Sequence, residues 1–109
     1  MGYNDPKERD RYVDIICEVH RQAGCRESYV RSIVEEGILT AIRAEEGCLC
    51  YDYYFSAQDE NVVLLIEQWE SEAHQRVHMQ QPHMARLREL KARYIDSTTM
   101  GKAELHDAV

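Results

Sequence analysis

The chain has 109 residues, of which 44% are hydrophobic and 30% charged, and its formal net charge at pH 7 is −7. This length fits one domain, and the composition is that of a folded globular protein. The acidic balance argues against a nucleic-acid partner and against docking on anionic lipid, because both need clustered basic residues. The longest uninterrupted apolar run, Val62–Ile66, is too short to span a membrane. We expect a cytoplasmic protein, since the polar N-terminus has no apolar signal core.

Residues 1–10 are predicted to form a flexible tail, residues 11–105 one domain, and residues 106–109 a C-terminal tail. The run RYVDIICEVH over residues 11–20 alternates with a period of two, which predicts a strand. One face of this strand would carry Val13, Ile15, Cys17 and Val19, and the other Tyr12, Asp14, Ile16, Glu18 and His20.

A helix is predicted over residues 27–44, where apolar residues recur at spacings of three and four. Gly47 follows it and suits the left-handed conformation that often ends a helix. The predicted apolar stripe consists of Val30, Ile33, Val34, Gly37, Ile38, Ala41 and Ile42.

Two further strands are predicted over residues 47–56 and 61–69, joined as a hairpin by a short polar linker. Cys48 and Cys50 should share a strand face and so should not pair with each other; we expect ordinary thiols. The strand over residues 61–69 is apolar on both faces, although helices can cover only one face of a small sheet. A second copy of the same sheet is the simplest cover for the other face, which predicts a homodimer packed sheet against sheet.

Ser71 is predicted to cap a short helix over residues 72–80, and Pro82 to begin another, since proline suits the first turn of a helix. The second helix should bury Met84, Leu87, Leu90 and Tyr94, and a last strand follows. The predicted order is strand, helix, strand, strand, helix, strand. This order predicts an α+β, ferredoxin-like βαββαβ fold with an antiparallel sheet.

Glu67 lies between Leu65 and Trp69 on one face of its strand. In apolar surroundings its carboxylate would have a raised pKa and become a usable base near neutral pH. Alternatively, it is a glutamate at a strand end that reaches solvent or an arginine. The residues leave both interpretations open.

His74, His78 and His83 raise the question of a metal site, because the first two are one helical turn apart. The chain has no H-E-x-x-H motif, however, and the third ligand would lie beyond the helix break at Pro82. We therefore predict no metal. His78 and His83 are candidate polar groups of an apolar pocket, since imidazoles titrate near neutrality; spacing alone does not separate that role from a structural one.

Aromatic residues gather on the second and third predicted strands. They are either plain core, as strand aromatics usually are, or the walls of a flat pocket for a planar ligand. The residues concerned are Trp69, Tyr51, Tyr53 and Phe55.

Two segments, EEGCLCYDYYF and IEQWESEAHQRVHMQQPHM, resemble the antibiotic biosynthesis monooxygenase family, and within it the bacterial quinol monooxygenases. The likeness covers about residues 11–105. It implies a ferredoxin-like protomer that dimerises through its sheets into an α/β barrel. It also implies an oxygenase that uses O₂ without any cofactor, whether metal, flavin or haem, and acts on a small aromatic such as a quinol.

The resemblance implies that the catalytic candidates are His78, His83 and Glu67, one of which would be the base. It implies that the substrate pocket is lined by Trp69, Tyr51, Tyr53 and Met84. It does not extend to the haem-degrading relatives, whose asparagine, tryptophan and axial histidine match Asp14, His78 and a position near Arg88. The linker over residues 56–61 is also shorter than in the quinol monooxygenases.

Two alternatives remain on the same fold, because a fold does not fix a function. One is a non-catalytic dimer that binds a small ligand. The other is an isomerase or signal-processing enzyme that acts on a small carbonyl compound. Turnover with oxygen separates both from a quinol oxygenase.

Overall fold

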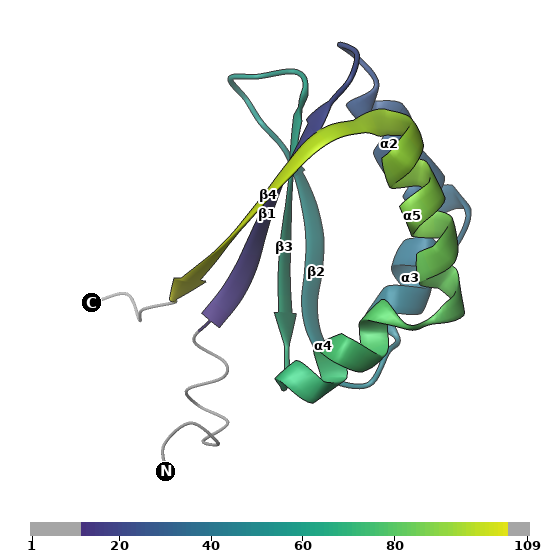
Figure 1. Cartoon of the computed structure of the whole chain (residues 1–109), viewed down its shortest axis with the longest axis vertical. Coiled ribbons are helices and arrows are strands. Elements are labelled where there is room, and N and C mark those ends of the chain that lie inside the picture. The colour runs from purple at the N-terminus through teal and green to yellow at the C-terminus, as the bar shows by residue number, and fades with distance from the viewer. Residues whose placement is uncertain (1–11, 105–109) are drawn as a thin grey trace.

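The computed structural model describes residues 12–104, so the predicted tails at 1–10 and 106–109, and residues 11 and 105, lie outside the described part. The four strands form one antiparallel sheet in the order β2-β3-β1-β4, with the helices on one face (Figure 1). This is the predicted α+β ferredoxin-like fold. The elements are β1 (Tyr12–His20), α2 (Arg26–Glu35), α3 (Ile38–Arg43), β2 (Cys48–Phe55), β3 (Val62–Trp69), α4 (Glu72–Met79), α5 (Pro82–Tyr94) and β4 (Ile95–Glu104).

The prediction of a single helix over residues 27–44 is wrong. Two helices, α2 and α3, occupy this stretch and are separated at Gly37, whose φ of +79° is left-handed. A left-handed residue interrupts the helical hydrogen bonds, and glycine adopts that conformation at little steric cost. Ile33 and Ile42 remain fully buried on either side of the break, whereas Val34, predicted to be buried, is 50% exposed.

β1 turns its more polar face toward the helices. Ile16 and Glu18 are paired with the buried Leu65 and Val63 of β3, and paired residues share a face of the sheet. Glu18 is completely buried and His20 nearly so. The helix side of the sheet is therefore an apolar core that also contains ionisable groups.

β2 contains an irregularity at its start that sequence alternation does not reveal. Cys48 is paired with Trp69, whereas Cys50 is paired with Gln68, so Leu49 is an extra residue in β2. Cys48 therefore lies on the helix side of the sheet and Cys50 on the opposite side. The prediction that the two thiols share a face is wrong. All four cysteines are free.

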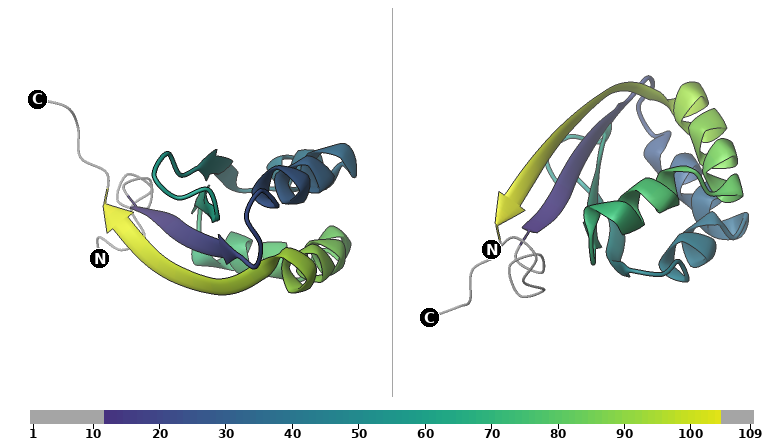
Figure 2. Two further views of the ribbon diagram at one scale, coloured as in Figure 1. Left: turned by 90° about the horizontal axis from the view of Figure 1, so that it is seen from above. Right: turned by 60° about the horizontal axis from the view of Figure 1, so that its bottom comes forward.

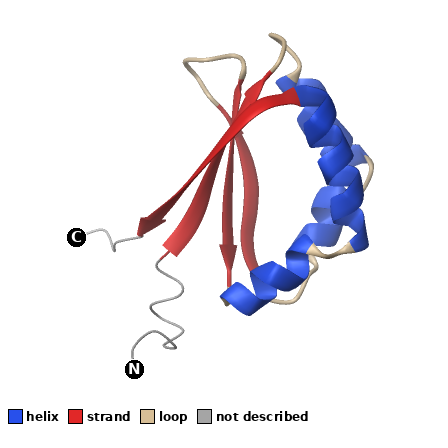
Figure 3. Cartoon of the chain, in the orientation of Figure 1, coloured by secondary structure: helices blue, strands red, loops and turns tan. Residues whose placement is uncertain are grey.

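The sheet has one open face. On β3, Val63, Leu65, Glu67 and Trp69 share one face, as the alternation predicts. This face is buried under the helices, and the alternate residues point away from them. The views in Figure 2 show the described helices gathered on a single side of the sheet, which the colours of Figure 3 make plain. No helix of residues 12–104 has the length and apolar character needed to cross a membrane. The open face carries the partly exposed residues Ile15, Cys17, Val19, Val62, Leu64 and Ile66.

Candidate active site

A carboxylate and two imidazoles meet where three elements converge. Glu45 lies in the turn between α3 and β2, His78 in the last turn of α4, and His83 in the first turn of α5. Glu45 Oε2 is 2.9 Å from His78 Nδ1 and 2.7 Å from His83 Nε2. We call these three residues the Glu45 triad.

Local sequence brings the three elements into contact. Gly47 has a φ of +83°, as its predicted left-handed role requires, and a Cβ at this position would overlap the ring of His74. The absence of that Cβ lets α4 pack directly on the turn that carries Glu45. Ser71 caps α4, as predicted, by accepting a hydrogen bond from the backbone N–H of His74. Pro82 begins α5 in the expected way, so His78 and His83 belong to two helices that converge on one carboxylate.

The hydrogen bonds of the triad define which imidazole nitrogens are available for chemistry. A carboxylate can only accept, so neutral His78 donates from Nδ1 and neutral His83 donates from Nε2. Nε2 of His78 and Nδ1 of His83 then carry the lone pairs. A carboxylate that holds an imidazole in this tautomer prepares the opposite nitrogen to accept a proton and stabilises the imidazolium that results.

Two aromatic rings hold His78 in place. Its ring centroid is 4.5 Å from that of Trp69 at an interplanar angle of 32°, and 5.5 Å from that of Tyr51 at 62°. The side chain of His78 is only 1% exposed, whereas that of His83 is 21% exposed. Of the two imidazoles, His78 is thus the fixed one and His83 the one nearer to solvent.

Glu67 is buried, and its carboxylate binds the indole of Trp69. Trp69 Nε1 donates to Glu67 Oε1 at 2.7 Å, and Gln75 Nε2 donates to the same oxygen at 3.1 Å. Gln75 also donates to Asp14 at 2.8 Å. The partners of Glu67 are thus Trp69 and Gln75, not solvent or an arginine. Its carboxylate orients the ring that packs on His78.

The other predicted pocket residues lie in the packed core. The ring of Tyr53 is 5.9 Å from that of Tyr51, so it is one step further from His78. Met84 is buried in the same core cluster as Tyr51 and Trp69. Among the predicted site residues, His78 thus contacts Trp69 and Tyr51, and Glu67 contacts Trp69. His83 is linked to His78 through Glu45, which the sequence did not single out as a site residue.

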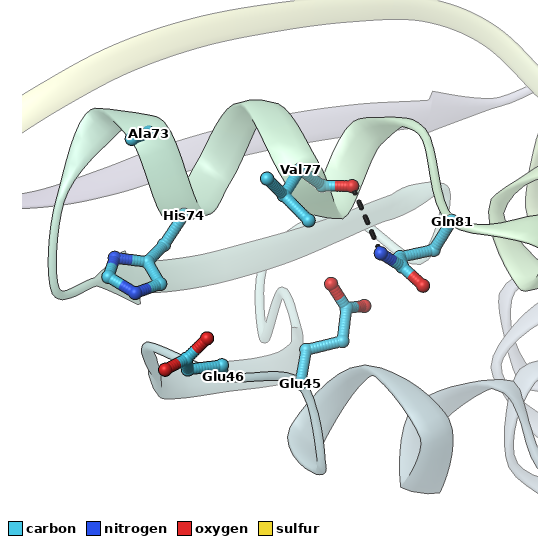
Figure 4. Close-up of a pocket in the computed structure, with 6 residues that line it drawn as sticks. All are labelled: Glu45, Glu46, Ala73, His74, Val77 and Gln81. Atoms are coloured by element: carbon cyan, nitrogen blue, oxygen red, sulfur yellow. Dashed lines mark hydrogen bonds between the residues drawn. The ribbon is translucent and has the colours of Figure 1, made fainter.

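A surface pocket of about 420 Å³ opens beside the triad. Figure 4 shows the carboxylate of Glu45 pointing across this pocket toward Val77 of α4 and Gln81, the residue before α5. The pocket therefore provides access from solvent to the shared carboxylate. Its lining consists of Glu45, Glu46, Ala73, His74, Val77 and Gln81.

A second buried carboxylate lies deeper under the helices. Both carboxylate oxygens of Glu18 are 3.2 Å from the Tyr29 hydroxyl, which donates to them, and Lys91 Nζ is 3.5 Å from Glu18 Oε2. Burial raises the pKa of Glu18, while Lys91 and Tyr29 act in the opposite direction. Burial also raises the pKa of Tyr29 far above its ordinary value. We call Glu18, Tyr29 and Lys91 the Glu18 cluster.

Sequence reasoning missed Glu45, Gln75 and the whole Glu18 cluster. Glu45 lies in a Glu-Glu-Gly run that reads as an ordinary helix end, and nothing in the run shows which of its two carboxylates turns inward. His74, considered together with the other two histidines, is outside the triad, and its Nδ1 is 2.6 Å from Ser71 Oγ.

Fold and site together define a small α+β domain with an acid–imidazole cluster beside an indole. A family model described as "Antibiotic biosynthesis monooxygenase" matches residues 18–90, and the chain belongs to this family. A search of curated proteins found no match.

Several solved structures share the fold. PA3566 from Pseudomonas aeruginosa has a TM-score of 0.73 and 22% identity, with 89% of this chain and 95% of that chain covered. The "Putative antibiotic biosynthesis monooxygenase" from Nitrosomonas europaea has a TM-score of 0.72 and 19% identity, with 85% and 88% covered. A Bacteroides thetaiotaomicron protein titled "Possible Oxidoreductase" has a TM-score of 0.69 and 20% identity, with 86% and 95% covered.

Proposed function

We propose that the protein is a cofactor-independent monooxygenase or oxidase that uses O₂ to oxidise a small aromatic substrate, with a quinol as the expected type. The observation that carries this proposal is the single carboxylate of Glu45 between His78 and His83, with His78 packed on Trp69. Family membership supports an oxygenase, and the site supports the acid–base step that such a reaction needs.

In the proposed reaction His78 takes the proton of a substrate hydroxyl at Nε2. Glu45 stabilises the resulting imidazolium, and the more exposed His83 passes protons between the triad and solvent. The electron-rich substrate anion then reduces O₂. In an oxidase reaction the quinol loses two electrons and two protons, and O₂ becomes hydrogen peroxide. In a monooxygenase reaction one oxygen atom enters the substrate and the other leaves as water.

Glu67 acts in this scheme through Trp69. The indole forms a flat wall next to His78, and the hydrogen bond that it donates to Glu67 fixes its orientation. An aromatic wall of this kind suits a planar substrate and excludes water from the reacting atoms. Tyr51 is edge-on to His78 and Tyr53 lies behind it, so both continue this wall toward the core.

The first experiment is oxygen uptake by purified, metal-stripped protein that is given a reduced naphthoquinol. Saturable uptake well above that of heat-denatured protein is the expected result. An assay for hydrogen peroxide separates oxidase from monooxygenase stoichiometry. No uptake above background would reject quinol oxidation, and would favour the ligand-binding or carbonyl-isomerase alternatives.

We also propose that the protein is a homodimer joined through the open face of its sheet, in a reducing compartment such as the cytoplasm. The face is apolar along β1 and β3, and a second copy provides a surface of the same character. The four free thiols fit a reducing environment. Leu64→Lys should give a monomer by light scattering after size exclusion, whereas Val34→Lys on α2 should not. A dimer that persists in Leu64→Lys would reject this interface.

A further inference from the structure

The Glu45 triad has the chemistry of a metal site as well as that of a base. One potential ligand atom from each of Glu45, His78 and His83 lies within 4.8 Å of the other two. Two imidazole nitrogens and one carboxylate oxygen are a donor set that suits divalent transition-metal ions such as Zn²⁺, Co²⁺ and Ni²⁺. It differs from an acidic surface cluster, which would suit hard cations with oxygen ligands.

The three donors are held by independent parts of the fold. Glu45 comes from the turn before β2, His78 from α4 and His83 from α5, so the helical layer positions them before any ion binds. Packing of His78 against Trp69 and Tyr51 limits rotation of its ring. The Glu45 and His78 side chains are 9% and 1% exposed, so an ion bound there would be largely shielded from water.

Only small movements separate the hydrogen-bonded triad from a coordination site. Ligand atoms that are roughly 2.0–2.1 Å from a tetrahedral zinc ion are about 3.3 Å apart. The two distances from Glu45 Oε2 are 2.7 and 2.9 Å, so this oxygen would move about half an ångström away from each nitrogen. Each imidazole would also move its proton to the opposite nitrogen. The pocket beside Glu45 offers a path for a hydrated ion and room for a water molecule as the fourth ligand.

Histidine spacing predicted no metal because His74 and His78 would form the first pair and the third ligand would lie beyond Pro82. The structure provides Glu45 in place of His74, which is bonded to Ser71. The objection that Pro82 separates the histidines also disappears, since α4 and α5 both direct a histidine toward the same carboxylate oxygen.

We infer that Glu45, His78 and His83 bind one divalent transition-metal ion of the Zn²⁺ type. Binding displaces the two hydrogen bonds of the triad and occupies the nitrogen atoms that face Glu45. An ion bound there would prevent His78 and Glu45 from acting together in proton transfer. Inhibition of oxygen uptake by Zn²⁺ is therefore expected, and this consequence, unlike the binding itself, depends on the proposed function.

Calorimetric titration of metal-free protein with Zn²⁺ tests the site. One ion should bind per protomer, and Glu45→Gln and His83→Ala should each weaken binding by at least about tenfold. His20→Ala is the matched control, because it removes a buried histidine that packs against Tyr29 and Tyr94 outside the triad and its pocket, and its affinity should stay within about twofold of the wild type. Circular dichroism of each variant verifies that it is folded.

Absorption spectra with Co²⁺ exclude binding to the four free cysteines. Coordination by imidazole and carboxylate gives weak visible bands only, whereas thiolate ligands add strong charge-transfer bands in the near ultraviolet. Thiolate bands, or Zn²⁺ affinities that are equal in wild type, Glu45→Gln and His83→Ala, would overturn the site.

The metal site and the proposed function can fail separately. Zn²⁺ binding that needs the triad, in a protein without oxygen uptake, would support the site and reject the quinol oxidase. Oxygen uptake in a protein that binds no Zn²⁺ would support the quinol oxidase and reject the metal site.

Discussion

Glu18 and Glu45 both lie on the helix side of the sheet with little exposure, but they differ in their partners. Glu18 is completely buried, and its partners are a phenol and a lysine. Glu45 holds two imidazoles, each with a second ring nitrogen that can exchange a proton, and lies beside a pocket. Burial of an acid is therefore not enough to mark a functional site. The chemistry of its partners and their access to solvent distinguish the proposed catalytic cluster from a structural one.

The largest expected effect is on the rate of oxidation, and it distinguishes the two buried histidines, His78 and His20. His78→Ala should lower the rate of quinol oxidation by about 10²–10⁴-fold, because the proposed general base is lost. His20→Ala is the matched control, since His20 is also buried but packs against Tyr29 and Tyr94, away from the triad. Oxygen uptake by both variants, measured on protein with the oligomeric state of the wild type, makes the comparison. Equal rates in the two variants would leave His78 with a lining role only.

The next effect concerns stability. Glu18→Ala leaves Tyr29 and Lys91 without their buried acceptor and should lower the free energy of unfolding by about 3 kcal/mol. Glu45→Ala should cost about 2 kcal/mol, since His83 can bond to water instead but the buried Nδ1 of His78 loses its acceptor. Urea denaturation followed by circular dichroism measures both values. The contrast would be refuted if Glu45→Ala were the more destabilising of the two.

Substitutions of Glu67 distinguish positioning from direct base catalysis. Glu67→Ala should lower kcat about tenfold, because Trp69 loses the hydrogen bond that orients it. Glu67→Gln should restore most of this rate, since an amide oxygen still accepts from Trp69 Nε1. If Glu67 were itself the base, the glutamine variant would be as slow as the alanine variant. Steady-state kinetics with the naphthoquinol decide between the two roles.

The smallest effect is a pH dependence of stability. Burial lowers the pKa of His20 below 6.5, and both of its ring nitrogens lack a partner among the described residues. The unfolded chain then binds a proton more readily, so the contribution of His20 to stability is lost as pH falls below about 6.5.

His20→Phe removes this dependence and the two unpaired nitrogens. The variant should be more stable by roughly 1 kcal/mol at pH 7, and the difference between its Tm and that of the wild type should widen from pH 7 to pH 5. Scanning calorimetry across this range makes the measurement. A constant difference would show that His20 does not titrate differently in the folded and unfolded states.

Sequence periodicity predicted the elements of the fold well, because hydrophobic spacing reports which face of an element is covered. It failed where one residue changes the backbone locally. Gly37 fits the apolar spacing of a continuous helix, yet its left-handed conformation divides that helix in two. Leu49 fits a simple alternation, yet as an extra residue it moves Cys48 to the other side of the sheet.

The candidate site was predictable only in part. Trp69 and His78 could be singled out because tryptophan and histidine are rare and chemically distinct residues. Glu45 could not, since charged residues are common at helix ends and the direction of a side chain depends on tertiary packing. The polar inner face of β1 was equally hidden, because alternation shows that two faces exist but not which one the helices cover.

The packing of Trp69 on His78 has a practical consequence. Trp69 is the only tryptophan of the chain, and its ring centroid is 4.5 Å from that of the imidazole. Its fluorescence therefore reports on this site alone. A proton added to His78 should quench the emission, and a paramagnetic ion such as Co²⁺ in the triad should do so more strongly. The protein thus carries an intrinsic optical probe at the position where its proposed chemistry takes place.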